Sequence, residues 1–209
     1  MKNVIIVGAS GFGREVLHTI GEINKVNPAY HVEGFIDDNP NALAGFNLEY
    51  KVLGPISGWV PKETDRYVLA IADPKTKEKI IPALKEKGAR FETVIAPTAS
   101  VAEGAQLGEG VVVFGHSGIS INTRIGNFVF FNAMGGIGHD VVIGDYCTFG
   151  PKVCISGYTK VGRCVNFGAL SSTYPGITIG DYATVGMNSA AIRRVKPNTT
   201  VVGVPAKEI

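Results

Sequence analysis

The sequence lacks most of the features that mark disulfide-rich, membrane-spanning or nucleic-acid-binding proteins. Its three cysteines form no CxxC pair, and their odd number argues against a disulfide framework. No apolar run approaches the roughly 20 residues that span a bilayer, and the run at 4–7 is too short for a signal peptide. With a net charge of +2 and no stretch rich in lysine and arginine, nothing indicates nucleic-acid binding. We therefore expect a cytoplasmic protein without membrane or nucleic-acid partners.

What the sequence does contain is a strict period of six. From Ile95 to Ala191 an anchor residue, almost always apolar, occupies every sixth position without a slip of frame. Helices repeat an apolar face every three to four residues and strands every two, so neither accounts for this period. Hexads are typical of parallel β-helices, in which three short strands complete a coil of about eighteen residues. We expect about five coils, with the anchors pointing inward and the small residue after each anchor letting the backbone turn.

The first 92 residues predict a separate, small α/β domain. A buried strand at 4–7 runs into the glycine turn at 8–13, which leads into a stretch at 14–20 with helical apolar spacing. Glycines let a phosphate approach the backbone, and the first amides of the helix then point at the anion. The spacing is GxxGxG rather than the dinucleotide-binding GxGxxG, so a tight turn without a ligand remains an alternative.

Two further strands are expected to end at the same sheet edge. The strand at 31–36 leads to Asp37 and Asp38, and the strand at 67–71 leads to the loop at 72–75, before an amphipathic helix at 79–87. The paired acids are placed to accept hydrogen bonds from a ribose or a base, although they would also suit a solvated turn. We place the domains at residues 1–92 and 93–209, and expect the stretch at 201–207 to cap the last coil.

The hexad frame predicts where the histidines of the solenoid lie. His139 and His116 fall at corners of the predicted prism and should face outward, whereas His18 and His31 are expected to be surface or packing residues. Asp140 could hold one ring nitrogen of His139 and raise the basicity of the other, and Gly157, one coil above, should leave open space beside the ring. The alternative is an exposed corner histidine beside an unrelated acid.

A catalytic zinc site is not expected. Such a site normally has three protein ligands, and only two histidines lie in the solenoid, without an HxxxxH pair. We therefore expect no metal.

Taken together, the hexads, the GASGFG opening and the VVGVPAK ending resemble the bacterial sugar acyltransferases of the sialic acid O-acetyltransferase type. This group includes enzymes that N-acetylate UDP-linked 4-amino sugars, and the resemblance covers essentially the whole chain. It implies an α/β N-terminal domain with a small Rossmann-like parallel sheet, followed by an all-β left-handed parallel β-helix. It also implies a homotrimer with acetyl-CoA bound between adjacent solenoids, and a sugar or nucleotide sugar held by the N-terminal domain.

The resemblance also implies roles for particular residues. The family's base lies in an H-[DE]-x-V-I-G motif, matched here by His139 and Asp140, and its upstream asparagine, an aid in orienting the acceptor, by Asn132. Positions that contact coenzyme A fall on Thr148, Gly157, Ala169 and Met187, and those that bind substrate on Ser10, Gly11, Phe12, Asp37, Asp38, Ala72 and Lys75. Phe12 and Thr148 replace histidines that the amino-sugar enzymes often carry, which puts a UDP-sugar substrate in doubt but leaves the base in place.

The function that follows is acetyl-CoA-dependent acetylation of an amine or hydroxyl of a sugar or nucleotide-linked sugar, in surface glycan biosynthesis. His139 would act as general base, with direct attack on the thioester. A noncatalytic nucleotide-sugar-binding or regulatory protein, with the solenoid as a trimer scaffold, is the alternative from another class. A serine- or antibiotic-directed acetyltransferase fits less well, because small free acceptors need no nucleotide site.

Overall fold

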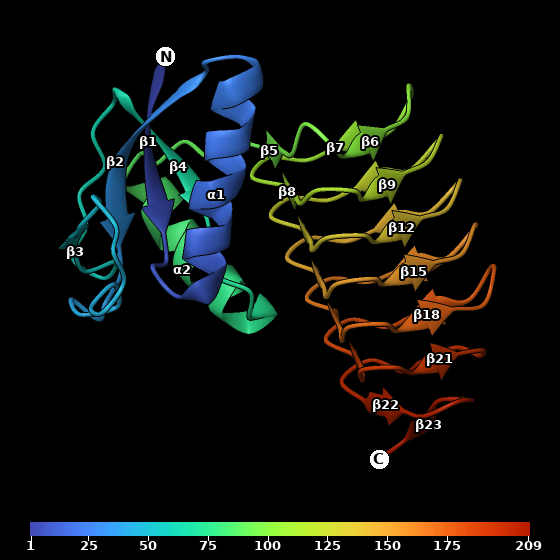
Figure 1. The fold of residues 1–209 in the computed structure, drawn as a ribbon. Helices are drawn as coiled ribbons and strands as arrows, with labels where there is room; N and C mark the ends of the chain where they lie inside the picture. Colours follow the sequence, from blue (N-terminus) through green and yellow to red (C-terminus); the bar gives the residue numbers. More distant parts are fainter.

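The computed structural model describes all 209 residues and has two parts, an α/β domain and a long solenoid (Figure 1). The N-terminal sheet is entirely parallel, with the strand order β3-β2-β1-β4. Its strands are β1 (Lys2–Val7), β2 (Tyr30–Ile36), β3 (Val52–Gly54) and β4 (Asp65–Leu69), and its helices are α1 (Gly11–Val26) and α2 (Pro74–Glu86). The small Rossmann-like parallel sheet expected from the sequence is therefore confirmed.

Two details of this domain differ from the expectation. Helix α2 begins at Pro74, five residues earlier than predicted, because Asp73 caps it by accepting a hydrogen bond from the Thr76 amide at 2.8 Å. Proline is well suited to this first helical position, where its missing N–H would have no partner. The three-residue strand β3 was not predicted, since so short an edge strand carries no alternation of apolar and polar residues.

The solenoid is a left-handed parallel β-helix with three faces. Face one contains β5 (Val94–Ile95), β8 (Val112–Val113), β11 (Phe130–Phe131), β14 (Thr148–Phe149), β17 (Asn166–Phe167), β20 (Thr184–Val185) and β22 (Thr200–Val202). Face two contains β6 (Ser100–Val101), β9 (Gly118–Ile119), β12 (Gly136–Ile137), β15 (Cys154–Ile155), β18 (Ser172–Thr173) and β21 (Ala190–Ala191). Face three contains β7 (Gln106–Leu107), β10 (Arg124–Ile125), β13 (Val142–Ile143), β16 (Lys160–Val161) and β19 (Thr178–Ile179).

The predicted repeat sets the packing inside the solenoid. Each strand pairs in parallel with its equivalent one coil away, as Phe131 does with Phe149 and Phe149 with Phe167. These three rings stack along the axis with centroids 4.8 and 4.9 Å apart, and every anchor from Val113 to Ala191 is buried. Face two holds six strands, so the solenoid is about one coil longer than expected.

The backbone does not turn where the sequence suggested. At every corner from Gly104 to Asn188 the third residue after the anchor has a positive φ, in a series that runs every six residues and includes bulky side chains such as Phe128 (57°) and Tyr146 (64°). The glycines that follow the anchors serve another purpose. A Cβ at Gly144 would lie 2.8 Å from backbone atoms of Gly162 in the next coil. These positions are small because neighbouring coils approach closely, and not because the chain needs a left-handed conformation there.

The end of the chain covers the last coil, as expected. β22 continues face one by pairing in parallel with β20, and β23 (Lys207–Glu208) then pairs with β22 in the antiparallel direction. The terminal hairpin thus occupies the sheet edge that the last coil would otherwise expose.

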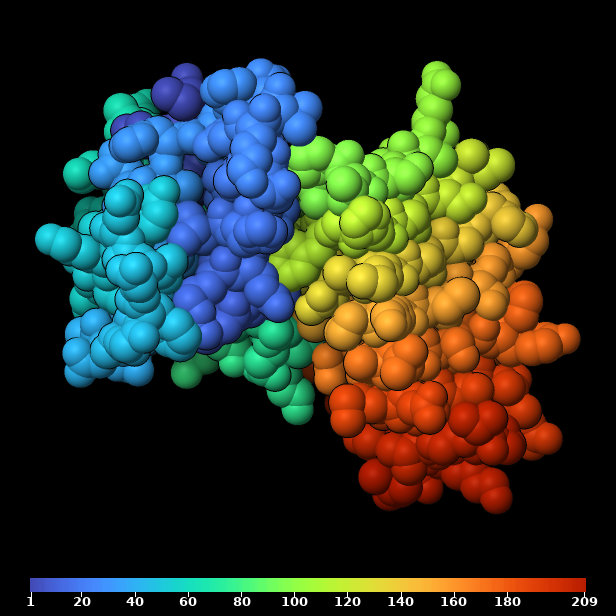
Figure 2. Space-filling model, viewed as in Figure 1, coloured from blue at the N-terminus to red at the C-terminus, as the bar shows by residue number.

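The α/β domain packs against face one near the start of the solenoid, and the last coils project beyond it (Figure 2). Outward-facing residues of that face, including Val112 and Phe130, join the buried cluster formed by the α/β sheet and its helices. Phe91 forms a parallel bridge with Tyr67 of β4, and β5 begins the solenoid three residues later. The outer side of face one therefore belongs to the core of the α/β domain, whereas the interior of the solenoid forms a second buried cluster.

Candidate active site

His139 stands at the corner that follows face two, with its side chain 51% exposed. Its Nδ1 lies 2.8 Å from Oδ2 of Asp140, and Asn122 donates to the other oxygen of that carboxylate at 3.3 Å. An ionised carboxylate can only accept, so Nδ1 carries the proton and Nε2 keeps a free lone pair. The ring of Tyr158 meets the imidazole edge-on at 5.0 Å between centroids. Asp140 thus orients a half-exposed imidazole whose Nε2 has no hydrogen-bond partner within the chain.

Gly157 supports the imidazole directly. A Cβ at this position would lie 2.8 Å from Cε1 and 2.9 Å from Nε2 of His139. The space that the sequence suggested would stay open for a ligand is thus filled by the imidazole of His139. Glycine is required there because a Cβ would overlap the ring.

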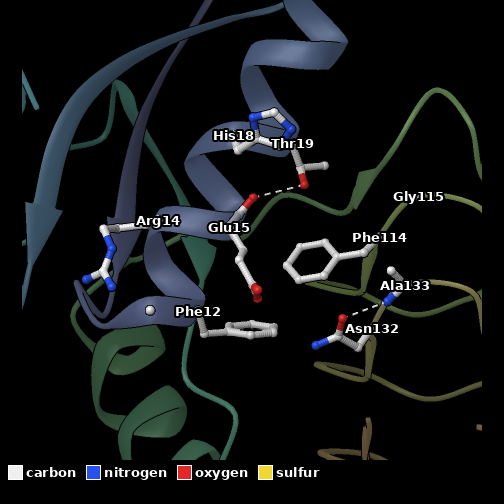
Figure 3. A pocket seen from close by; sticks show the side chains of 10 residues that line it. Phe12, Arg14, Glu15, His18, Thr19, Phe114, Gly115, Asn132 and Ala133 are labelled. Carbon is white, nitrogen blue, oxygen red and sulfur yellow. Dashed lines mark hydrogen bonds between the residues drawn. The ribbon is translucent and has the colours of Figure 1, made fainter. Parts of the chain in front are cut away.

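A pocket of about 690 Å³ opens between the start of α1 and the corner that follows face one (Figure 3). It is lined by Gly11, Phe12, Arg14, Glu15, His18, Thr19, Phe114, Gly115, Asn132 and Ala133. Phe12 forms its apolar wall and contacts Phe130 and Phe114 with ring centroids 4.9 and 5.1 Å away. The Asn132 side chain accepts a hydrogen bond from the Ala133 amide at 2.7 Å, which fixes the amide group at the rim.

The three glycines of the turn before α1 have different roles. Gly8 has φ +102° and no room for a Cβ, which would lie 2.8 Å from the Ala70 carbonyl oxygen. A Cβ at Gly13 would lie 2.2 Å from the Gly8 carbonyl oxygen, so Gly13 lets helix and strand pack closely. Gly11 is open, and the exposed Ser10 that precedes the helix makes no side-chain cap. The helix N-terminus is therefore free to receive an anion.

Both carboxylates of the paired acids already accept hydrogen bonds from groups within the chain. Asp37 accepts from the Ala9 amide and the Asn39 amide, each at 2.8 Å, and so fixes the glycine turn to the end of β2. Asp38 accepts from the amide and hydroxyl of Ser57 at 3.1 and 3.2 Å and lines a second cavity of about 410 Å³ beside α2. Both side chains lie at the carboxyl edge of the sheet, as predicted.

Thr148 and Ala72 meet in the domain interface. The Thr148 hydroxyl donates to the Ala72 carbonyl oxygen at 2.5 Å and accepts from the Lys77 ammonium at 2.8 Å. Thr148 is 9% exposed, so its hydroxyl is already satisfied and shielded. This placement does not support the expected contact between Thr148 and coenzyme A. Lys75, in the first turn of α2, is exposed.

No role was predicted for Lys77 from the sequence, yet its side chain is fully buried. Its ammonium donates to the carbonyls of Phe128 and Cys147 at 3.1 and 2.9 Å and lies 4.1 Å above the Phe130 ring. Burial lowers the pKa of this lysine to about 7. The residue fixes α2, and with it the loop before the helix, to two coils of the solenoid.

The remaining predicted positions lie on two separate corners. Ala169 and the exposed Met187 follow face one at successive coils, on the corner that also carries Asn132 and Ala133. His139 and Gly157 follow face two. Within one chain, the oriented base and the pocket beside Asn132 thus occupy neighbouring corners of the prism and do not meet.

Sequence reasoning missed the residues of α1 and the first coils that complete the pocket. Glu15, His18 and Thr19 follow Phe12 at three- and four-residue helical spacing, a signal that would have placed them on one helix face. His18, interpreted as a surface or packing residue, lines the pocket. Phe114 could not have been found this way, because its position depends on how the two domains pack.

No helix is both long enough and apolar enough to cross a membrane. All three cysteines are free thiols. No group of three or more histidine, cysteine, aspartate or glutamate side chains lies close enough to hold a metal ion.

Comparison with known proteins gives a consistent result. Residues 3–84 match the family model described as the PglD N-terminal domain. The GDP-perosamine N-acetyltransferase of Escherichia coli O157:H7 is 29% identical over 156 residues, which cover 73% of this chain and 69% of that protein. A point mutant of perosamine N-acetyltransferase from Caulobacter crescentus, in complex with CoA and GDP-perosamine, superposes with a TM-score of 0.88 at 25% identity, covering 100% of this chain and 97% of the other.

A third relative supports the fold alone. The acetyltransferase domain of PglB from Neisseria gonorrhoeae, in complex with acetyl coenzyme A, has a TM-score of 0.89 at 21% identity and covers 100% of this chain and 99% of its own. Together, the glycine-turn α/β domain, the complete β-helix and these relatives make the chain similar in sequence and fold to bacterial sugar N-acetyltransferases with a hexapeptide-repeat solenoid.

Proposed function

We propose that this protein transfers an acetyl group from acetyl-CoA to an amine or hydroxyl of a nucleotide-linked sugar, as a step in surface glycan biosynthesis. The observation that carries the proposal is the exposed His139, oriented by Asp140 and supported by Gly157. Related enzymes named for GDP-perosamine acetylation support the class of substrate. A noncatalytic binding protein would have no need for a base held in one orientation.

In the proposed reaction, Nε2 of His139 accepts the proton of the attacking N–H or O–H group. The lone pair of that nitrogen or oxygen forms a bond to the thioester carbonyl carbon. The carbon–sulfur bond then breaks, and the thiolate leaves with the proton that His139 returns. Asp140 keeps the imidazole in one tautomer and stabilises the imidazolium that forms transiently. A positioned base is typically worth about 10² to 10⁴ in rate.

We propose that the active site is completed by a second copy of the chain, in a homotrimer. His139 and Asn132 occupy different corners of the same prism, so a cleft between two solenoids would bring the base of one copy to the pocket of another. Acetyl-CoA would lie in that cleft, along the small or exposed positions Gly157, Ala169 and Met187. Measurement of mass in solution tests this, and a monomer that is fully active would refute it.

For the nucleotide we propose the carboxyl edge of the α/β sheet. The open helix N-terminus at Ser10, Gly11 and Phe12 would receive a phosphate, with Lys75 as a nearby cation. Asp37 and Asp38 border this edge, where their remaining acceptor capacity suits ribose hydroxyls. Phe12 packs against solenoid aromatic rings, so it contributes a backbone amide and an apolar surface rather than a side-chain donor.

The test is release of free thiol from acetyl-CoA in the presence of nucleotide sugars. Wild-type protein is expected to release thiol with at least one sugar, and His139→Ala to lower turnover about 10²- to 10⁴-fold. The variant should keep the thermal midpoint of the wild type, because the ring is half exposed. Equal turnover in the two proteins would remove His139 from the mechanism.

A further inference from the structure

The carboxylate of Glu15 points into the pocket beside Asn132, between the rings of Phe12 and Phe114 (Figure 3). Glu15 lies one turn into α1, so the helix fixes it relative to the glycine turn. The pocket therefore combines an anionic group with two aromatic walls and an amide. Aromatic faces cover the apolar side of a sugar ring, while carboxylates and amides bind its polar substituents.

The charge of Glu15 is not neutralised within the chain. None of the ion pairs includes it. The adjacent Arg14 turns away, with its guanidinium carbon 3.6 Å above the ring of Phe46. Arg14 also lines the pocket but forms no ion pair with Glu15, and of the remaining lining residues only His18 is titratable. The pocket thus presents one carboxylate without an ion-pair partner, which attracts a cation or a hydrogen-bond donor.

We propose that Glu15 selects an acceptor sugar that carries an amine, by binding that amine beside Asn132. This inference rests on the proposed function and deepens it. A hydroxyl has one proton, which must go to the base, so a hydroxyl that donates to Glu15 cannot also donate to His139. An amine has N–H groups to spare. One can donate to the carboxylate while another proton passes to the imidazole.

The test compares matched nucleotide sugars that differ only in an amine or a hydroxyl, such as GDP-perosamine with GDP-rhamnose and a UDP-linked 4-amino sugar with its 4-hydroxy counterpart. Dissociation constants are measured by calorimetry for the wild type, Glu15→Gln and the control Glu86→Gln. Glu86 is exposed at the end of α2, so the control removes the same charge away from the pocket.

The wild type and the control should prefer the amine in at least one pair by about 10- to 100-fold, as expected for a hydrogen bond to a charged group. Glu15→Gln should lose most of that preference but bind the free nucleoside diphosphate unchanged. A wild type that prefers the amine in no pair, or a Glu15→Gln variant that keeps the preference, would overturn the inference.

The thiol-release assay separates this inference from the proposed function. If the wild type and Glu15→Gln acetylate amine and hydroxyl acceptors with equal efficiency, the function stands and the selection by Glu15 fails. If the amine preference depends on Glu15 but no sugar stimulates thiol release, the selection of an amine by Glu15 is supported and the transferase function is refuted.

Discussion

Replacing the buried Lys77 with methionine should change how stability depends on pH. The ammonium of Lys77 is fully buried, and burial lowers its pKa from 10.5 to about 7. Between these two pH values the unfolded chain binds more protons at this position than the folded chain does. The buried Lys77 therefore makes its full contribution to the free energy of unfolding above pH 10.5. This contribution is lost as the pH falls to about 7.

The size of the effect follows from the shift. Each pKa unit corresponds to about 1.4 kcal/mol, so the free energy of unfolding of the wild type should rise by roughly 3 kcal/mol between pH 7 and 9.5. Lys77→Met has no titrating group at this position and should lack that rise. It also leaves the Phe128 carbonyl without the donor it has in the wild type, at a cost of about 1 to 3 kcal/mol.

Urea unfolding at several pH values, at one protein concentration, measures the difference between the two proteins. Subtracting one curve from the other removes the titrations they share, and the Cys147 thiol stays protonated because burial raises its pKa to about 12. Lys79→Met, which removes an exposed lysine from the same helix, is the control and should show the wild-type dependence. Parallel curves for the wild type and Lys77→Met between pH 7 and 9.5 would refute the reasoning.

Three further predictions concern the imidazole and the solenoid interior. Asp140→Asn should lower turnover, but less than His139→Ala, because Asp140 orients the base and takes no proton; a loss as large as that of His139→Ala would contradict this role. Gly157→Ala should displace the His139 imidazole, since the new Cβ would lie 2.8 Å from it, and should therefore reduce turnover. Binding of the nucleoside diphosphate, measured without acetyl-CoA, should not change. Phe149→Ala breaks the ring stack at its middle and should lower the free energy of unfolding by about 3 to 5 kcal/mol in urea titrations, whereas an effect below 1 kcal/mol would indicate a loosely packed interior.

The sequence was sufficient for the solenoid and for the corner position of His139, because both depend on the hexad frame. Counting in sixes places His139 and Asp140 at a corner, and adding one coil places Gly157 against them. The positive φ at Phe128 and Tyr146 could not be read in this way, since bulky residues seldom adopt that conformation and only the pairing of coils enforces it.

The pocket and the domain interface could not be predicted from the sequence, for a different reason. Phe12 was placed among the substrate-binding positions, in place of a histidine of the amino-sugar enzymes, but its surroundings are set by Phe114 and Phe130, which lie about a hundred residues later in the chain. Lys77 lies in a helix rich in exposed lysines, and only the packing of α2 on face one shows that this one is buried. Both results depend on contacts between domains, which no local pattern encodes.

The hydrogen bond from Thr148 to the Ala72 carbonyl has a consequence for how the enzyme works. This bond and the buried ammonium of Lys77 fasten the loop at 72–75 to face one of the solenoid, where the two parts pack in one buried apolar cluster. A closing motion between the two parts would have to break these buried contacts. The residues at this junction are therefore aligned when the chain folds.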